Sequence, residues 1–402
     1  MKTNGKDTKL GVVPALRFPE FDNYWDIKEM SKIANLIKER ARNGNYTPMS
    51  VTSGVGLVSQ KEKFGRDISG NQYSSYFVIR KGDFAYNKSA TNLYPEGYIS
   101  MLKKLEIAAV PNSIFTCFKV NRKEVLPEYL DYLFENNYHG KWLRKFIEVG
   151  ARAHGSLSID TKKLFELPIV FPSINEQQKI ADCLSSIDAL IKATENKIDE
   201  LKAHKKGLMQ QLFPAEEKTV PILRFPEFQN AGEWKQTTIG AICTISNGKS
   251  NVQDNVQNGK YPLFDRSEII KASNKFLFDC EAIIIPGEGR FIPKYYIGKF
   301  DLHQRAYALK DFTCHALFVY HYITAFSFIL TQKAVKSTVL SLRMPILEAF
   351  PLLLPNIQEQ QKIANCLSSV DDLITAQTNR LEALRNHKKG LMQQLFPNID
   401  EC

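Results

Sequence analysis

A chain of 402 residues, 44% hydrophobic and 24% charged, has the composition of an ordinary folded protein and enough length for two or three domains. Seven cysteines, an odd number with no C-x-x-C pair, argue against a disulfide framework or a cysteine-based zinc site and predict a cytoplasmic protein with reduced thiols. The net charge of +10 favours a polyanionic partner, most often nucleic acid.

The first predicted domain, residues 1–174, starts with a polar stretch that is no signal peptide, followed by an extended lead-in. This lead-in spans residues 14–25. Its segment PALRFPEF at residues 14–21 holds two Pro and two Phe, and we expect it to dock its aromatic rings on a core. Strands are predicted at residues 76–79 and 114–120, and a helix at residues 127–148. This mixture predicts an α+β domain.

Residues 175–214 predict one long helix with a single apolar stripe. Apolar residues follow one another at steps of four and three from Ile180 onward, which is the spacing of a coiled-coil seam. No proline interrupts the segment before Pro214. At about 1.5 Å per residue, the helix is a rod of roughly 55 Å. Thr194 and Lys205 fall in the seam, where polar residues cost stability but fix register and partner.

The same order of segments then occurs again. Residues 215–357 form the second predicted domain, which starts with a second lead-in, PILRFPEF at residues 221–228. A strand is predicted at residues 282–285 and a buried helix at residues 316–330; the apolar run that contains this helix is short for a membrane span. Residues 358–397 are identical to residues 175–214 at 27 of 40 positions, and they leave a tail of residues 398–402.

This repeat predicts two α+β domains in tandem, each followed by a long helix. A rod with one apolar stripe needs a partner. We expect the two rods to pack as an antiparallel coiled-coil pair with pseudo-two-fold symmetry; the alternative is that each rod lies on its own domain. The predicted apolar seam comprises Ile180, Leu184, Ile187, Ile191, Ile198, Leu201, Leu208, Ile363, Leu367, Val370, Ile374, Leu381, Leu384 and Leu391.

The sequence contains no recognisable catalytic or metal-binding motif. Gly248-Lys249-Ser250 lacks the preceding glycine of a phosphate-binding loop, because Cys243 stands at that position. The seven histidines show no H-E-x-x-H spacing. We therefore predict no catalytic residues, no metal site and no cofactor in this chain.

Three doubled features carry a family resemblance: the lead-in LRFPEF, the block P-x-x-x-P-x-x-x-x-EQ-x-KIA, and the rod end HKKGLMQQLFP. With these, the chain resembles, along essentially its whole length, the specificity subunit of type I restriction-modification systems. Residues 82–88 also look like a strand-to-loop element of that family, whereas the comparable residues 281–287 lack its Asn-Lys.

The resemblance implies a non-catalytic subunit. Its two target recognition domains would each read one half of an asymmetric, bipartite site on double-stranded DNA, and its rods would set the spacing. The implied partners are two adenine-methylating subunits and motor-nuclease restriction subunits, with no membrane. S-adenosylmethionine, ATP and Mg²⁺ would belong to those partners.

DNA contacts are expected from basic and amide side chains in loops, because these side chains bind phosphates and base edges. Any one of them is also an ordinary surface charge when taken alone. The candidates are Lys61, Lys63, Arg66, Asn87, Lys88, Arg152 and His154 in the first domain, and Lys249, Arg266, Arg290, Lys294, His303, Gln304, Arg305 and Arg343 in the second.

Three other functions remain open from the sequence. The chain could be a stand-alone DNA-binding regulator or adaptor, an enzyme such as a nuclease with an unrecognised site, or a structural coiled-coil protein. Co-purified methylating subunits, DNA cleavage by the pure chain with Mg²⁺, and salt-sensitive DNA binding discriminate among them.

Overall fold

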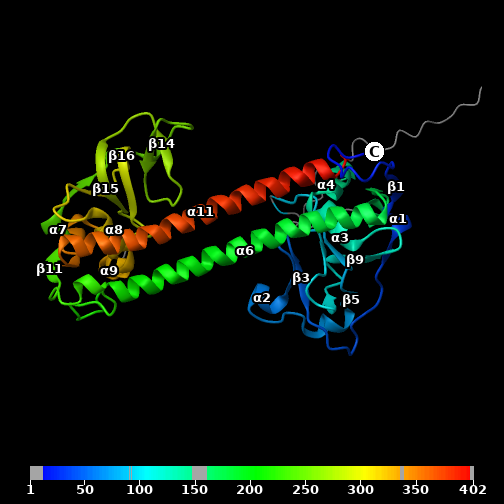
Figure 1. The fold of residues 1–402 in the computed structure, drawn as a ribbon. Helices are drawn as coiled ribbons and strands as arrows, with labels where there is room; N and C mark the ends of the chain where they lie inside the picture. The colour runs from blue at the N-terminus through cyan, green and yellow to red at the C-terminus, as the bar shows by residue number, and fades with distance from the viewer. Residues whose placement is uncertain (1–11, 90, 92, 147–160, 336–338, 399–402) are drawn as a thin grey trace, which may run out of the picture. The chain divides into compact units, whose positions relative to one another are not determined.

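The computed structural model describes residues 12–89, 91, 93–146, 161–335 and 339–398 (Figure 1). The chain divides into two compact units: unit 1 joins residues 1–193 to residues 381–402, and unit 2 comprises residues 194–380. The two long helices, α6 (Ile174–Leu212) and α11 (Ile357–Leu395), each contribute residues to both units. Each unit therefore contains one predicted domain together with parts of both rods.

The domain of unit 1 is built from small antiparallel sheets. The main sheet has four strands in the order β2-β9-β6-β7, and β3-β4, β5-β8 and β1-β10 form pairs. The strands are β1 (Asp26–Glu29), β2 (Ala34–Leu36), β3 (Met49–Thr52), β4 (Gly56–Ser59), β5 (Phe77–Arg80), β6 (Phe84–Asn87), β7 (Tyr98–Met101), β8 (Ile107–Val110), β9 (Phe115–Val120) and β10 (Pro168–Phe171). The helices are α1 (Met30–Ile33), α2 (Gln60–Phe64), α3 (Pro127–Glu135), α4 (Tyr138–Leu143) and α5 (Thr161–Phe165).

The single helix predicted at residues 127–148 is wrong. The chain forms α3 and α4 instead, followed by a 3-10 turn at Arg144–Phe146. Asn137 lies between the two helices with φ of 56°, a left-handed conformation that a right-handed helix cannot include. Asparagine adopts this conformation more readily than most residues, so the Asn-Asn step allows the break.

The domain of unit 2 has a different main sheet but a similar two-stranded pair. Six strands follow the order β12-β17-β15-β16-β13-β14, and β11 pairs with β18. The strands are β11 (Lys235–Thr238), β12 (Thr244–Asn247), β13 (Tyr261–Phe264), β14 (Lys271–Ser273), β15 (Phe278–Pro286), β16 (Lys294–Leu302), β17 (Ala306–Lys310) and β18 (Pro351–Leu354). The helices are α7 (Ile239–Ile242), α8 (Ala316–Ala325), α9 (Ser327–Lys333) and α10 (Met344–Glu348).

The apolar run of unit 2 forms two helices, α8 and α9, where one was predicted at residues 316–330. Phe326 separates them with φ of −107° and ψ of 20°, outside the helical range. Phe318, Val319 and Ile323 of α8 are buried in the core of unit 2. Within the described residues, no helix has the length and apolar character of a membrane span.

Each lead-in clamps the first turn of a rod. In unit 1, Arg17 donates from Nε and Nη2 to the two carboxylate oxygens of Glu176 at 2.7 and 2.8 Å. In unit 2, Arg224 binds Glu359 in the same way, with both distances 2.7 Å. Glu176 and Glu359 are buried, and a carboxylate in the first turn also interacts favourably with the helix dipole. The lead-ins therefore fix where each rod starts.

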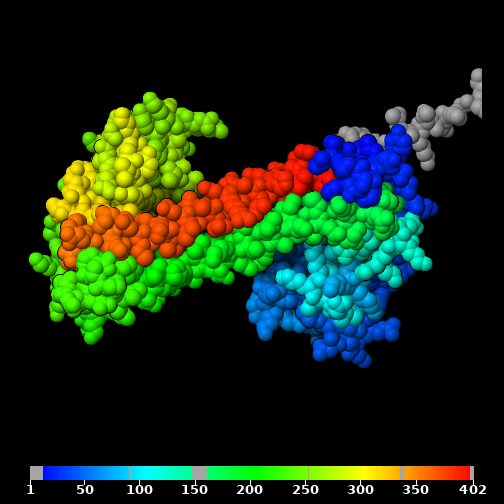
Figure 2. Space-filling view, in the orientation of Figure 1, coloured from blue at the N-terminus to red at the C-terminus, as the bar shows by residue number. Residues whose placement is uncertain are grey.

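Inside each unit the two rods run antiparallel. In unit 1, Ile180 and Leu184 near the start of α6 share a core with Met392 and Leu395 near the end of α11 (Figures 1 and 2). In unit 2, the arrangement is reversed: the end of α6 (Met209, Leu212) shares a core with the start of α11 (Ile363, Leu367). Both cores also include residues of the adjoining domain, so each rod packs on its own domain as well as on the other rod.

Candidate nucleic-acid interface

Four loops of unit 2 meet around the turn His303–Arg305, which joins β16 to β17. The N–H of His303 donates to the carbonyl of Phe264 at the end of β13, at 2.9 Å. The N–H of Gly287, which follows β15, donates to the carbonyl of Arg305 at 2.8 Å, and the N–H of Gln304 donates to the carbonyl of Ser250 at 2.9 Å. These backbone bonds place side chains from separate parts of the sequence on one surface.

Glycine is required where these loops approach most closely. A Cβ atom on Gly287 would lie 2.5 Å from the carbonyl oxygen of Arg305, and one on Gly248 would lie 2.2 Å from that of Leu302. Real Cβ contacts are longer, so any other residue would push the loops apart. Gly248, which lacks the context of a phosphate-binding loop, and Gly287 therefore serve the packing of this surface.

The buried carboxylate of Asp301 holds together the segments beneath this surface. Asp301, with 1% exposure, accepts hydrogen bonds from the hydroxyls of Ser250 at 2.7 Å and Ser273 at 2.9 Å and from the Leu302 N–H at 2.9 Å. Hydrogen bonds compensate for the burial of a charged group. The sequence analysis did not identify Asp301, because nothing in its local pattern separates it from a surface aspartate.

The loops enclose a polar hollow of about 480 Å³ lined by Asn251, Gln253, Asp265, Arg266, Glu288, His303, Gln304 and Arg305. The structure thus brings together four predicted DNA-contact residues, Arg266, His303, Gln304 and Arg305. The amide of Gln304 donates to Asn251 at 2.7 Å. Burial lowers the pKa of His303, which favours the neutral ring, and its Nδ1 accepts the N–H of Arg305.

The remaining candidates of the second domain lie outside this hollow. Arg290 is 84% exposed and pairs at 3.3 Å with Glu268, itself 72% exposed. Lys294 is half-buried and donates to the Ser267 carbonyl, and burial lowers its pKa. Lys249 and Arg343 are exposed.

In unit 1, exposed Lys61, Lys63 and Arg66 lie on or directly after α2. Lys88 is half-buried, with its Nζ 3.4 Å from the Thr161 hydroxyl. Asn87 is buried, and its side-chain oxygen accepts the N–H of Ser89, so this amide shapes a turn rather than projecting from the surface. Arg152 and His154 lie outside the described residues.

One surface cation of unit 1 was missed by the sequence analysis. Arg40 follows β2, and its guanidinium lies 4.1 Å from the centroid of the Phe77 ring while Nη1 donates to the Ser75 carbonyl. It borders a hollow of about 540 Å³ that Lys38, Lys88 and Asn112 also line. The available signal was the Lys-Glu-Arg run directly after a strand.

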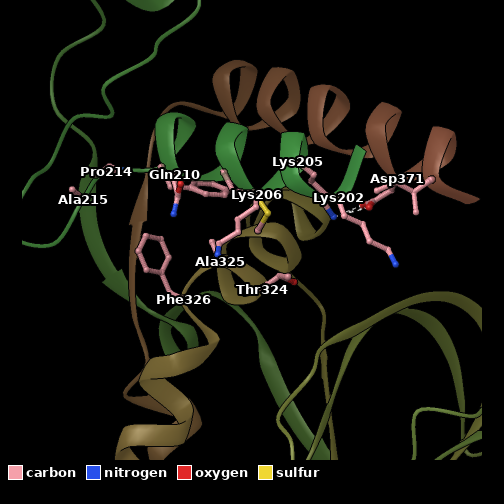
Figure 3. Close-up of a pocket in the computed structure, with 13 residues that line it drawn as sticks. Lys202, Lys205, Lys206, Gln210, Pro214, Ala215, Thr324, Ala325, Phe326 and Asp371 are labelled. Atoms are coloured by element: carbon pink, nitrogen blue, oxygen red, sulfur yellow. Dashed lines mark hydrogen bonds and ion pairs between the residues drawn. The ribbon is translucent and has the colours of Figure 1, made fainter. Parts of the chain in front are cut away.

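The rods present a second surface that is a candidate for binding a partner. In unit 2, Lys205 of α6 donates to both oxygens of Asp371 of α11 at 2.6 Å. Beside this pair, the end of α6 and the end of α8 border a hollow of about 730 Å³, shown in Figure 3, lined mainly by apolar residues such as Met209, Phe213 and Phe326. In unit 1, the equivalent Lys388 reaches Asp188 and Glu135, each at 2.7 Å.

All the predicted seam residues are buried or half-buried. Ile180, Leu184, Ile187, Ile198, Leu201, Ile363, Leu367 and Val370 are buried, and Ile191, Leu208, Ile374, Leu381, Leu384 and Leu391 are half-buried. Within the described chain no cluster of three metal-ligating side chains occurs.

Comparison with known proteins gives a consistent family. The model of the type I restriction modification DNA specificity domain matches residues 25–203 and 231–386. The EcoDI specificity subunit of Escherichia coli is 29% identical over 166 residues, which cover 41% of this chain but only 37% of that protein. The putative MjaX specificity subunit of Methanocaldococcus jannaschii is 24% identical over an alignment covering 98% of this chain and 96% of that protein.

Two solved structures share the fold. The crystal structure of a type I restriction-modification S subunit from M. genitalium has a TM-score of 0.63 at 16% identity, with 96% of this chain and 99% of that chain covered. A chain from a structural study of complex assembly in the type I system has a TM-score of 0.55 at 15% identity, with 93% and 98% covered.

Proposed function

The chain belongs to the family of type I restriction-modification DNA specificity proteins, and from this premise we propose that it reads an asymmetric, bipartite DNA site with one half-site for each domain. The observation that carries the proposal is the difference between the two domains. Matching lead-ins and rods support a four-stranded main sheet in one unit and a six-stranded sheet in the other. Two domains with different surfaces on matching lead-ins and rods suit two half-sites of different sequence.

The rods would hold the domains at a fixed spacing and helical phase on the duplex. A stiff, sequence-encoded support suits this task better than a flexible linker, because a flexible linker would blur the phase. The repeated Lys–Asp pairs give the two rod ends similar surfaces, which supports docking of two copies of one methylating subunit.

In this proposal the chain has no catalytic activity of its own and works in the cytoplasm. Its partners would methylate adenine with S-adenosylmethionine, and motor-nuclease subunits would cleave unmodified DNA with ATP and Mg²⁺. The positive net charge would supply the sequence-independent part of DNA affinity.

The test is reconstitution with a methylating subunit of a type I restriction-modification system. We expect two methylating subunits per chain, a footprint on two separated half-sites, and methylated adenines at one asymmetric sequence. The chain alone with DNA and Mg²⁺ should produce no cleavage. Sequence-specific DNA binding by a chain that recruits no methylating subunit would instead support a stand-alone regulator, and a symmetric site would contradict the role of the two unlike domains.

A further inference from the structure

We infer, on the basis of the DNA-reading role proposed above, that Glu288 is a positioning residue that holds Arg266 and Arg305 as a pair of guanine-reading side chains. Glu288 lies directly after β15 and faces both arginines in the polar hollow of unit 2. Its Oε1 accepts from Nη1 of Arg305 at 2.6 Å, and its Oε2 lies 3.4 Å from Nη1 of Arg266.

The exposed fractions of the three side chains indicate which of them can contact DNA. The side chains of Arg266 and Arg305 are 64% and 63% exposed, whereas that of Glu288 is 18% exposed. The carboxylate is therefore recessed, with an arginine on each oxygen. Within the described part of the chain, each guanidinium gives only Nη1 to another side chain, so its other N–H groups remain available to a ligand.

The charge balance of the hollow favours a base edge over a phosphate. Glu288 opposes the two guanidinium groups in its lining, the charge of Asp265 is balanced by Lys271 at 2.6 Å, and burial favours the neutral form of His303, so a single positive charge remains. Phosphate sites need uncompensated positive charge, because neutralising the phosphate drives counterion release. This hollow instead offers many hydrogen-bonding groups with little net charge.

Guanine is the base whose edge fits a free guanidinium. Its O6 and N7 are neighbouring acceptors in the major groove, and a bidentate arginine is the commonest specific contact to them. An unrestrained arginine loses much rotamer freedom on binding. The bond to Glu288 orders each guanidinium before DNA arrives, which lowers that cost.

The backbone around the three residues is also held. Gly287 donates to the Arg305 carbonyl, and the Gly287 carbonyl in turn accepts the N–H of Leu342 at 2.8 Å. The N–H of Gly289 donates to the Leu340 carbonyl at 2.9 Å. The loop that carries Glu288 is therefore fixed on both sides of the carboxylate.

The test selects DNA from a randomised library with the full chain and its methylating partner, and then measures affinity for every single-base variant of the selected site. Arg305→Lys and Arg266→Lys keep the charge but lose the planar fork. We expect each to lose about tenfold or more of the preference for guanine at one base pair, with an unchanged salt slope. Glu288→Gln should weaken the preference at the same base pairs. Glu288→Asp keeps the carboxylate and should weaken the preference less than Glu288→Gln does.

Glu268→Gln is the matched control, because it makes the same charge change at the exposed Arg290–Glu268 pair in the same domain. It should leave base preference unchanged. The inference is overturned if both lysine variants keep the wild-type preference, or if Glu288→Gln changes affinity equally for all sequences. If Glu288→Gln does not fold, Glu288→Asp takes its place in the same comparison. Absence of any sequence preference in the wild-type protein would contradict the proposed function itself, which is a separate outcome.

Discussion

Lys205 and Asp371 join the end of the first rod to the start of the second, with both carboxylate oxygens 2.6 Å from the lysine Nζ. Lys205 occupies a seam position where an apolar residue would be expected, and its side chain is only 13% exposed. A half-buried cation of this kind fixes register, because a shifted register would leave it without its carboxylate. Lys388 and Asp188 repeat the relationship in unit 1 at 2.7 Å.

The two lysine sites differ in a way that can be measured. Lys388 also reaches Glu135 at the end of α3, whereas Thr324 stands near the end of α8 beside Lys205. Asp371→Ala should therefore leave Lys205 without a carboxylate and lower the free energy of unfolding by about 1–3 kcal/mol. Glu135→Ala, the control, should cost less because Lys388 keeps Asp188. Calorimetry of each variant checks this, and Thr324→Glu should recover part of the loss in Asp371→Ala; equal losses in both alanine variants would contradict the argument.

The lead-in clamp predicts a larger loss. Arg224→Ala leaves Glu359, whose side chain is 0% exposed, without its guanidinium partner. Removing one partner of a buried ion pair typically costs about 3–5 kcal/mol. Chemical denaturation should show this drop, and the double variant Arg224→Met with Glu359→Leu should be markedly more stable than Arg224→Ala. A double variant no better than the single one would show that the lead-in contributes mainly through packing.

Unit 1 should lose stability in mild acid because of His139. This histidine is completely buried, and burial lowers its pKa to about 4. The unfolded chain takes up the proton near pH 6.5, so stability is full above that pH and falls as the pH drops toward 4. The difference in pKa corresponds to about 3 kcal/mol. His139→Leu should flatten the dependence of unfolding free energy on pH between 7 and 5; an unchanged slope would assign the acid sensitivity to other groups.

Arg290 is expected to contact phosphate rather than a base. Its partner Glu268 is 72% exposed and is not itself held in place, unlike the recessed Glu288, so the guanidinium of Arg290 is not ordered for base reading. Arg290→Ala should weaken binding equally for selected and scrambled DNA and reduce the salt slope by about 0.9. Fluorescence titration at several salt concentrations measures both quantities. A loss confined to the selected sequence would instead show that Arg290 reads a base.

The DNA contacts stay a prediction, and the structure shows only where the candidate residues lie. Basic residues after strands drew attention to Arg266 and Arg305, which the structure places in one hollow. Glu288 was not considered, because an acidic residue in a DNA-binding loop has no sequence signal of its own. Asn87 was chosen from a family-like element, but a side chain in a short strand can face inward, and this one is buried.

The doubled plan and the two rods could be predicted from the sequence, because a 40-residue repeat and a heptad stripe are periodic patterns that reflect local geometry. The antiparallel packing of the rods and the contacts between distant residues became visible only in the folded chain. The Arg17–Glu176 clamp joins residues 159 positions apart, and the Glu288 hollow draws on four separate loops. Such contacts depend on how sheets and loops fold back on one another, and no local pattern in the sequence shows which distant residues will meet.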